Sequence, residues 1–398
     1  MLCVAAQMLQ AAILPPSHEK FQTAESTVEV YRWCRDVDAD LWKAGFGSQA
    51  KDGRFYQIAE DCLLDQFDFR YLVMRNGRTG EAALQPALLV DQDGAVGLPK
   101  QARNLVATVR KAFPRFLQMK LLMVGCAAAE GRPGSNEPWA LKALHEALPR
   151  VARGAGASVI VMKDFPAEYR TALKPVFERD DRRVPGMPAA TLDLAYASFE
   201  DYLQRKVGKV FRKNLRRKFR KLETAAPITM EVIADATDVA DELFALHKQT
   251  LERSEFQFEI LNQEFFERLG SDMPDKIRFF IWRQLGRIVA FNVCLIHEGV
   301  IHDLDIGMDY SVALDLHLYF VTWRDVVQWA IEHGLRAYHT GPLNYDPKLH
   351  LRLTLAPQDL YARHVAGWLN PFFKIAMQFM HPVGRDPIIR QFENAREL

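Results

Sequence analysis

The pattern of strands and helices in this chain of 398 residues runs through the same order twice, and this repetition most constrains the fold. In the first half, the strand-like runs 71–74 and 82–90 flank the turn Asn76-Gly77. Two such runs around Asn-Gly are typical of a β-hairpin. A third strand, a helix and a last strand follow at 119–125, 137–153 and 158–162. The order predicts a mixed α/β unit.

The second half repeats this order at an offset of about 180 residues. A hairpin, a third strand, a helix ending before Gly334 and a last strand are expected at 276–296, 300–307, 314–332 and 336–339. The repeat is one of pattern and not of sequence identity. Two copies of one α/β unit are the economical interpretation, and two unrelated domains that share common elements remain the alternative.

The length fits two domains, which we place at 25–190 and 191–360, after an N-terminal segment 1–24 and before a helical tail 361–398. The five cysteines contain no C-x-x-C pair, so we expect neither a disulfide framework nor a metal site, and a cytoplasmic protein. No apolar run is long enough to span a bilayer. Residues 2–14 are apolar, but no basic residue precedes them as in a secretory signal.

A strongly basic helix is predicted over 199–222, where ten Lys or Arg and one acid lie between Asp201 and Leu222. Apolar residues recur every three or four positions, so the helix can pack on one side while Arg212, Lys213 and Arg216 flank that stripe. Phosphates of a cofactor, an RNA or an anionic membrane are the expected partners. The alternative is a solvated face neutralised by acids from elsewhere in the fold, because the net charge of the whole chain is only +1.

Polar residues on the strand 300–307 form a second candidate site. Alternation along a strand predicts that Asp303 and Asp305 share one face and that His302 points to the other. A histidine, a carboxylate and a lysine at neighbouring strand ends could deprotonate an amine and stabilise an oxyanion. A hydrogen-bonded structural histidine is the alternative at His302.

The loop before the helix at 137–153 is the third candidate, because Gly131, Gly134 and Ser135 could present backbone amides to an anion. A tight connection between two elements explains the glycines equally well. The chain contains no G-x-S-x-G, H-E-x-x-H or G-x-x-x-x-G-K-[ST] motif, and no G-x-G-x-x-G after a strand. Hydrolase, zincin, P-loop and dinucleotide-binding functions therefore lose their main support.

The basic run 212–218 and the ending Ala330-Ile-Glu-His-Gly334, followed by Gly341-Pro-Leu-Asn-Tyr-Asp-Pro-Lys348, resemble the tandem GNAT-like acyltransferases that include the Fem-type enzymes. The resemblance implies two GNAT-like mixed-sheet domains and formation of an amide bond from an activated acyl donor. By position, Arg212, Tyr345 and Lys348 match residues that handle the donor or the acceptor in that family.

The chain also departs from the family pattern. GNAT acetyltransferases hold the coenzyme A pyrophosphate on an R/Q-x-x-G-x-G/A loop, and the corresponding segment 309–315 here has no glycine. The loop at Gly131 to Ser135 could serve instead, or the basic helix could hold an acyl carrier protein or an aminoacyl-tRNA. The absence of an inserted coiled-coil arm disfavours the tRNA.

The C-terminal stretch gathers apolar residues from Trp368 to Met380. Two interpretations remain open: a helix docked on the core, or an interfacial surface that holds an apolar chain or touches the inner face of a membrane. The second interpretation makes a lipidic amine worth considering as the acceptor.

Our leading hypothesis is an N-acyltransferase without a tightly bound cofactor, which moves an acyl group from acyl-CoA or acyl carrier protein to an amine such as a long-chain base, giving a ceramide-like product, or an amino acid. Asp305 or His302 would accept the proton, and Lys348 and Tyr345 would orient the carbonyl. Arg212, Lys213 and Arg216 would hold donor phosphates. The alternatives are a Fem-type transferase that uses aminoacyl-tRNA on a cell-wall precursor, and a non-catalytic module that binds anionic lipid or RNA.

Overall fold

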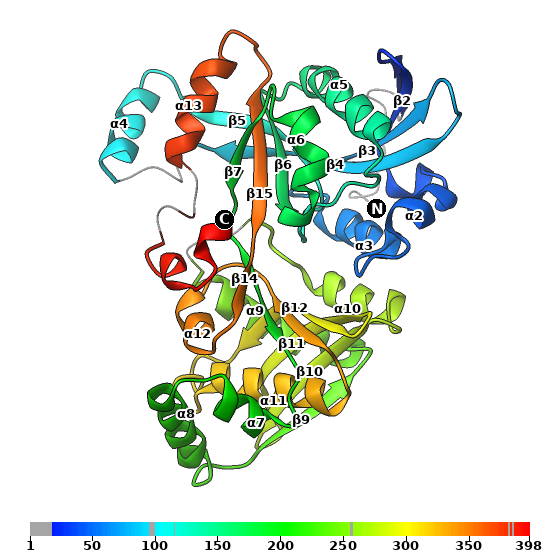
Figure 1. The fold of residues 1–398 in the computed structure, drawn as a ribbon. Coiled ribbons are helices and arrows are strands. Elements are labelled where there is room, and N and C mark those ends of the chain that lie inside the picture. The colour runs from blue at the N-terminus through cyan, green and yellow to red at the C-terminus, as the bar shows by residue number, and fades with distance from the viewer. Residues whose placement is uncertain (1–17, 95–99, 115, 255–257, 381–382, 384–385) are drawn as a thin grey trace, which may run out of the picture. The chain divides into compact units, whose positions relative to one another are not determined.

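A computed structural model describes residues 18–94, 100–114, 116–254, 258–380, 383 and 386–398. The chain forms two compact units (Figure 1). Unit 1 contains residues up to Ser48, Leu64–Arg183 and Leu360–Met380, and unit 2 contains Gln49–Leu63, Val184–Asp359 and His381–Leu398. The main boundary therefore lies a few residues before the expected one, and each unit also contains a short segment from the other half of the sequence.

Unit 1 is built on a mixed sheet of eight strands. Its parallel neighbours β5 and β6 follow an antiparallel meander, as expected from the predicted hairpin and third strand. The strands in spatial order are β1 (His18–Gln22), β2 (Ser26–Tyr31), β3 (Asp68–Asn76), β4 (Ala82–Asp93), β5 (Gln118–Val124), β6 (Val159–Pro166), β15 (Gln358–His364) and β7 (Arg182–Pro185).

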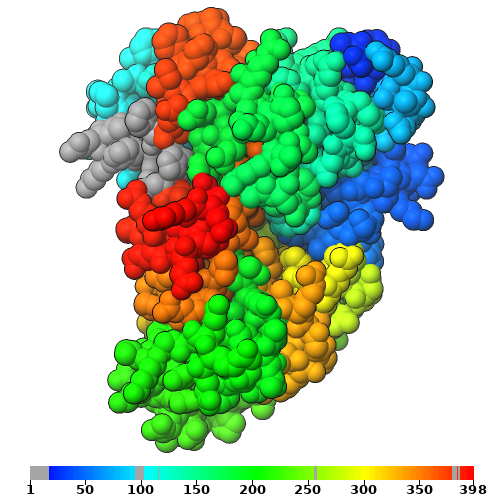
Figure 2. All heavy atoms as spheres, viewed as in Figure 1, coloured from blue at the N-terminus to red at the C-terminus, as the bar shows by residue number. Residues whose placement is uncertain are grey.

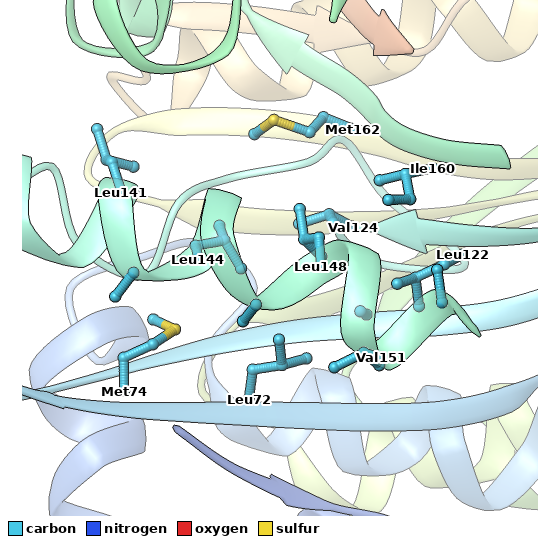
Figure 3. Close-up of a cluster of buried hydrophobic side chains, with 14 of the residues drawn as sticks. Leu72, Met74, Leu122, Val124, Leu141, Leu144, Leu148, Val151, Ile160 and Met162 are labelled. Carbon is cyan, nitrogen blue, oxygen red and sulfur yellow. The ribbon is translucent and has the colours of Figure 1, made fainter. Parts of the chain in front are cut away.

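The core of unit 1 lies between this sheet and α5 (Pro138–Gly154). Leu144 and Leu148 of α5 pack with Val124 and Ile160 of the central strands (Figure 3). On the other face of the sheet, Trp42 of α2 (Ala39–Phe46) lies 5.6 Å from the Tyr71 ring. The other helices of the unit are α4 (Lys100–Arg110), α6 (Arg170–Phe177), α13 (Asn370–Met380) and the short 3-10 turns η1 (Cys34–Asp36) and η2 (Ala167–Tyr169).

Unit 2 has a mixed sheet of seven strands with the same central arrangement. β12 pairs antiparallel with β11 and parallel with β13. The strands in spatial order are β14 (Thr354–Ala356), β8 (Ala189–Asp193), β13 (Ala337–Thr340), β12 (Val300–Met308), β11 (Arg287–His297), β10 (Ile277–Gln284) and β9 (Ile228–Ile233).

Helices cover both faces of this second sheet. Val326 and Val327 of α11 (Leu318–Glu332) pack in the core on one face, and α9 (Ala240–Leu251) contacts β11 and β12 on the other. The remaining helices are α3 (Gly53–Leu63), α7 (Phe199–Arg205), α8 (Lys209–Leu222), α10 (Gln263–Asp272), α12 (Tyr345–His350), η3 (Thr237–Val239), η5 (Ile389–Gln391) and η6 (Ala395–Glu397).

The basic helix predicted over 199–222 is two helices, α7 and α8, so this prediction was wrong in one respect. The chain breaks at Lys206 to Gly208, where glycine favours the helix terminus over the helix interior. The predicted apolar stripe is nevertheless present, because Leu203, Val207 and Leu215 are buried in one core cluster.

The predicted repeat of two mixed α/β domains is confirmed. In both units a third strand, a helix and a parallel last strand follow the hairpin, and the parallel ladders begin at Leu121 in unit 1 and at Val300 in unit 2. In the part of the chain that the structure describes, no helix has the length and apolar character needed to cross a membrane.

Candidate active site

A cavity of about 140 Å³ opens in unit 2 where β12 and β13 separate. The ladder between these strands ends at Asp303 and Thr340, although β12 continues to Met308. Side chains from β11, α11 and the segment after β13 close the cavity around this gap. Its polar lining includes Asn292, Asp303, Tyr319, Tyr338, Thr340 and Lys348.

Asp303 is the charged group of β12 that lines this cavity. Its carboxylate accepts hydrogen bonds from the Tyr338 hydroxyl at 2.5 Å and from Asn292 Nδ2 at 3.0 and 3.1 Å. Burial raises the pKa of Asp303 to about 6, although these hydrogen bonds and the Lys348 charge act in the opposite direction. A carboxylate with a pKa near neutrality is suited to accept a proton during a reaction.

Asn292 adds a second acceptor to the cavity. Its side chain is buried, and its Nδ2 atom donates to Asp303, so the amide oxygen Oδ1 is the free end of the group. This Oδ1 has no hydrogen-bond partner within the described structure. Because buried polar atoms are nearly always paired, the orphaned oxygen marks a position for an N–H or O–H donor of a bound molecule.

Lys348 of α12 lines the same cavity, and its Nζ donates to the carbonyl oxygens of Gly341 at 2.6 Å and Leu343 at 2.8 Å. These bonds hold a turn in which Leu343 and Asn344 both have positive φ angles, of 70° and 50°. Non-glycine residues reach this region at an energetic cost. Burial lowers the pKa of Lys348 to about 8, despite the opposing charge of Asp303. The lysine therefore shapes the cavity wall as a cation held by carbonyl groups.

The prediction that Asp303 and Asp305 share a face was wrong. Cys294 of β11 pairs with Asp303 and the preceding Val293 pairs with Asp305, so Leu304 is an extra residue in β12. Such a β-bulge shifts the alternation by one position. Asp305 therefore points to the opposite face of the sheet from Asp303 and contacts α9.

Asp305 binds His247 there, at 2.8 Å from Nδ1. Burial lowers the pKa of His247, but the hydrogen bond and the charge of Asp305 outweigh it, and the pKa is raised. His302 lies next to His339, with ring centroids 5.3 Å apart. Neither Asp305 nor His302 is among the residues that line the cavity.

Tyr345 does not line the cavity either. Its hydroxyl donates to the Pro188 carbonyl at 2.8 Å, and its ring packs with Phe392 in a small cluster. Of the four predicted catalytic residues, the structure brings only Lys348 to the cavity. The sequence pattern groups Asp303 with Asp305, and only Asp303 lines the cavity. The bulge that separates the two acids has no clear sequence signal.

α8, which carries the predicted phosphate-binding residues, packs beside the start of α11. Lys218 Nζ lies 4.6 Å from the centroid of the Phe320 ring. Burial, followed by the charges of Lys218 and Lys221, lowers the pKa of His317, which immediately precedes α11. The positive side of α8 therefore reaches the loop between β12 and α11.

The three cations predicted to hold phosphate differ in their partners. Arg212 donates to the carbonyls of Leu203 and Gln204, so it closes the end of α7. Arg216 pairs with Glu200. Lys213 is exposed, as are other bases of α8 at 209, 217, 220 and 221. The described structure thus leaves Lys213 in the best position of the three to meet a ligand.

The loop at Gly131 to Ser135 in unit 1 uses its polar groups internally. The Gly131 amide donates to the Asp164 carbonyl, the Gly134 amide donates to Gln85, and Ser135 Oγ accepts from the Glu137 amide. A Cβ atom at Gly134 would lie 1.8 Å from the Leu84 carbonyl oxygen. The glycines therefore allow close packing, and the amides predicted to bind an anion are already occupied.

Within the described residues, no group of His, Cys, Asp and Glu is arranged to hold a metal ion.

Residues 209–349 match the family model of the acetyltransferase (GNAT) domain. The match covers α8 through most of α12, and includes every residue of the cavity up to Lys348. No curated protein sequence matches the chain.

Solved structures share the architecture of most of this chain. FemX is similar over 89% of this chain and 100% of its own, with a TM-score of 0.53 and 12% sequence identity. L-PGS from Bacillus licheniformis is similar over 88% of this chain and 97% of its own, with a TM-score of 0.50 and 15% identity. At such low identity the likeness shows the fold.

Proposed function

We propose that this chain, a tandem GNAT-fold acyltransferase, transfers an acyl group from an activated donor to an amine that binds in the cavity of unit 2. The observation that carries the proposal is that the half-buried carboxylate of Asp303 and the unpartnered amide oxygen of Asn292 line one cavity. The carboxylate of Asp303 and the amide oxygen of Asn292 both accept hydrogen bonds, so together they complement the N–H groups of an amine.

Asp303 acts as the general base in this proposal. As the amine nitrogen attacks the acyl carbon, a C–N bond forms and the N–H group becomes acidic. Asp303 takes that proton and returns it to the leaving sulfur or oxygen as the bond from the acyl carbon breaks. Tyr338, whose pKa is raised well above its usual value by burial and by Asp303, stays protonated and keeps the carboxylate oriented.

The exposed edge of β12 is the proposed site of the acyl carbonyl. Beyond Asp303 the strand has no ladder partner on the β13 side, within the pairs that the structure describes. Backbone N–H groups along this edge can donate to the oxygen on which negative charge develops. Lys348 is a positioning residue, because its bonds to Gly341 and Leu343 fix the turn that faces this edge.

In this proposal the donor phosphates lie along the exposed bases of α8. A thioester of coenzyme A or of acyl carrier protein would lie with its phosphates near Lys213 and its acyl group toward the gap between β12 and β13. The absence of glycine from the loop 309–315 is compatible with this placement, because the cations of α8 supply the charge that the loop lacks.

An aminoacyl-tRNA is the second candidate donor, and the length of the basic helix favours it. α8 has 14 residues and its exposed bases are spread from Lys209 to Lys221. At about 1.5 Å per residue, this row is about 20 Å long, which is more than one pyrophosphate requires. A row of that length fits successive phosphates of a nucleic acid backbone.

Mass spectrometry of product mixtures tests the proposal. The purified chain is incubated with acyl-CoAs of graded length or with charged tRNA, together with a pool of amino-acid and lipid amines, and each reaction is repeated after ribonuclease treatment. An amide product that persists after ribonuclease identifies a thioester donor, and one that disappears identifies tRNA. Absence of any amide in all arms would contradict the proposal.

Substitutions of Asp303 and Lys348, each with a matched comparison, test the roles of these two residues. Asp303→Asn should remove turnover while retaining the fold, and Asp305→Asn is the matched control on the other face of the same strand. Lys348→Ala should also lose turnover, and Lys348→Arg should restore part of it if a cation is needed to hold the turn. Full activity of Asp303→Asn would refute the assignment of the base.

A further inference from the structure

Two segments of unit 1 place large apolar side chains in solvent. One is α4 with the turn that follows it, where Leu105, Phe113 and Phe116 are 66%, 68% and 42% exposed. The other is α13 with the residues before it, where Trp368, Phe372 and Ile375 are 74%, 69% and 57% exposed. We call these six residues the apolar rim.

The two segments leave the sheet of unit 1 at the same end. α4 and its turn lead into the start of β5, and the Ser158 amide at the start of β6 donates to the Lys120 carbonyl in β5. The Val365 amide, after the end of β15, donates to Ser158. The start of β5, which follows α4, and the end of β15, which precedes α13, therefore lie on either side of β6. Figures 1 and 2 draw the two helices on the same side of the unit.

α13 packs Phe373 against His364 but leaves other apolar side chains in solvent. Its cation Lys374 points to the protein and donates to the Arg179 carbonyl at 3.1 Å. Its aromatic and aliphatic residues Phe372 and Ile375 point outward. A surface helix in water normally buries its apolar stripe. The exposure of Phe372 and Ile375 is therefore suited to contact with an apolar phase such as lipid.

The turn after α4 exposes its aromatic residues and is linked to β4 through Arg110. Arg110 donates to the Phe116 carbonyl at 2.8 Å and pairs with both oxygens of Asp93 at the end of β4. Phe113 and Phe116 therefore extend into solvent from a hydrogen-bonded turn. Side chains on a hydrogen-bonded turn lose less conformational entropy on insertion than side chains on a flexible segment.

The charge of both segments has one sign. Residues 94–129 contain six Lys or Arg and no Asp or Glu, and residues 360–385 contain three Lys or Arg and no acid. The net charge of the whole chain is +1, so this bias is local. Arg103 and Lys111 are exposed beside the rim. Exposed Trp, Phe and Leu side chains combined with exposed Arg and Lys are typical of a surface that binds anionic lipid.

We propose that the apolar rim docks this chain on the surface of an anionic lipid bilayer. Trp368, Phe372 and Phe113 insert at the boundary between headgroups and acyl chains, and Arg103 and Lys111 contact the headgroups. The proposal does not depend on the acyl transfer, because it concerns unit 1 and a surface distinct from the cavity.

Co-sedimentation of the full chain with vesicles tests this docking. We expect binding to vesicles that contain phosphatidylglycerol, weaker binding to pure phosphatidylcholine, and loss of binding at high salt. Trp368→Ser combined with Phe372→Ser should reduce the partition constant for anionic vesicles at least tenfold, because two inserted rings are removed. Phe113→Ser should reduce it in the same direction.

The matched control is Leu285→Ser, which removes an 84% exposed leucine from a turn of unit 2. It should bind vesicles like the parent. Circular dichroism and thermal melting verify that the rim variants stay folded, and quenching of Trp368 by lipid-borne quenchers reports insertion directly, with Trp368→Phe as its blank.

Three results would overturn the proposal. The first is a parent chain that fails to bind anionic vesicles. The second is equal binding by the rim variants, or a loss caused only by Lys213→Ala and Arg217→Ala, which would place the contact on α8. The third is a parent that forms a stable dimer which the rim variants abolish, because the rim would then be an interface between copies of the chain.

Discussion

The two units contain the same pair of parallel strands, but what lies where the strands separate is different. In unit 2 the fourth pair of the ladder is Asp303 with Thr340, and in unit 1 it is Val124 with Met162. Val124 lies 179 positions before Asp303 and belongs to the apolar core (Figure 3). The same position in the fold thus carries a half-buried acid in one unit and a buried aliphatic side chain in the other.

A buried amide accompanies this position in both units. Asn292 and Gln85 each lie two residues before the strand partner of the fourth position, Cys294 and Ala87. Asn292 binds the carboxylate of Asp303, whereas Gln85 binds the backbone of Arg132 and Gly134. In unit 1 the amide therefore fastens the unit's own loop over the gap, and in unit 2 it faces a cavity.

The difference teaches that the fold alone does not make a site. A gap between parallel strands exposes backbone groups, and these must be satisfied by the chain itself or left available to a ligand. Unit 1 takes the first course with a glycine-containing loop, and unit 2 takes the second. We accordingly assign chemistry to unit 2 and a structural role to the corresponding region of unit 1.

The largest expected effect is on turnover. Asp303→Asn removes the proposed base and should lower kcat by about 10²- to 10⁴-fold, the range found for general base catalysis. The parent rate should also fall as the pH drops through about 6, because protonation of Asp303 removes the acceptor. Steady-state rates across pH measure both effects. A substitution Asp305→Asn with the same loss would break the distinction between the two faces of β12.

Placing an acid at the corresponding position of unit 1 should lower the free energy of unfolding. Val124→Asp places a carboxylate among apolar side chains without the partners that Asp303 has, and we expect a loss of about 3–5 kcal/mol in the free energy of unfolding. Val124→Ala is the control for lost volume. Urea denaturation followed by tryptophan fluorescence measures the change, and a stable Val124→Asp protein would show that unit 1 can accept a buried acid.

Asp303→Asn should also stabilise unit 2 at neutral pH. The pKa of Asp303 is about 6 in the folded chain against 3.8 for the free group, so the folded state binds the proton more tightly. The carboxylate therefore weakens the fold above pH 6 and has no such effect below pH 4. The gain from Asn should approach about 3 kcal/mol at pH 8 and vanish near pH 4. Thermal melting at both pH values gives the comparison, and equal gains at both would contradict it.

The smallest expected effect concerns the cations of α8. Lys213→Ala combined with Arg217→Ala should raise the KM for the donor about tenfold and flatten its dependence on salt, because two phosphate contacts are removed. The control is Arg78→Ala, whose side chain is 80% exposed in a hairpin of unit 1. Donor titrations at low and moderate salt measure the effect. An equal change in the control would mean that only overall charge matters.

The fold could be predicted largely from local patterns. The Asn-Gly turn, the alternating strand residues and the helical spacing around Leu144 each depend on neighbours in sequence, and the hairpins, strands and helices that they predict are present. The break at Gly208 and the exchange of short segments between the units were not predicted. The break has a local cause in Gly208, whereas the exchange of segments depends on contacts between residues that are distant in the chain.

The site was predicted less well for a specific physical reason. The sequence identified the acids of β12, the lysine after β13 and the basic helix, because charge in an apolar setting is conspicuous. It could not show that one inserted residue, Leu304, reverses the direction of every side chain after it. Asp303 and Asp305 are equivalent in the sequence, and only the register with β11 separates them.

The sequence by itself determined the number of units, the order of their elements and the location of the strong positive charge, because these follow from periodicity and composition. The tertiary structure alone decided which carboxylate binds Asn292, and that the Gly134 amide is already bonded. It also decided that the rings of α13 face outward. Each of these depends on which surfaces pack together, and packing is a property of pairs of distant segments that no single stretch of sequence contains.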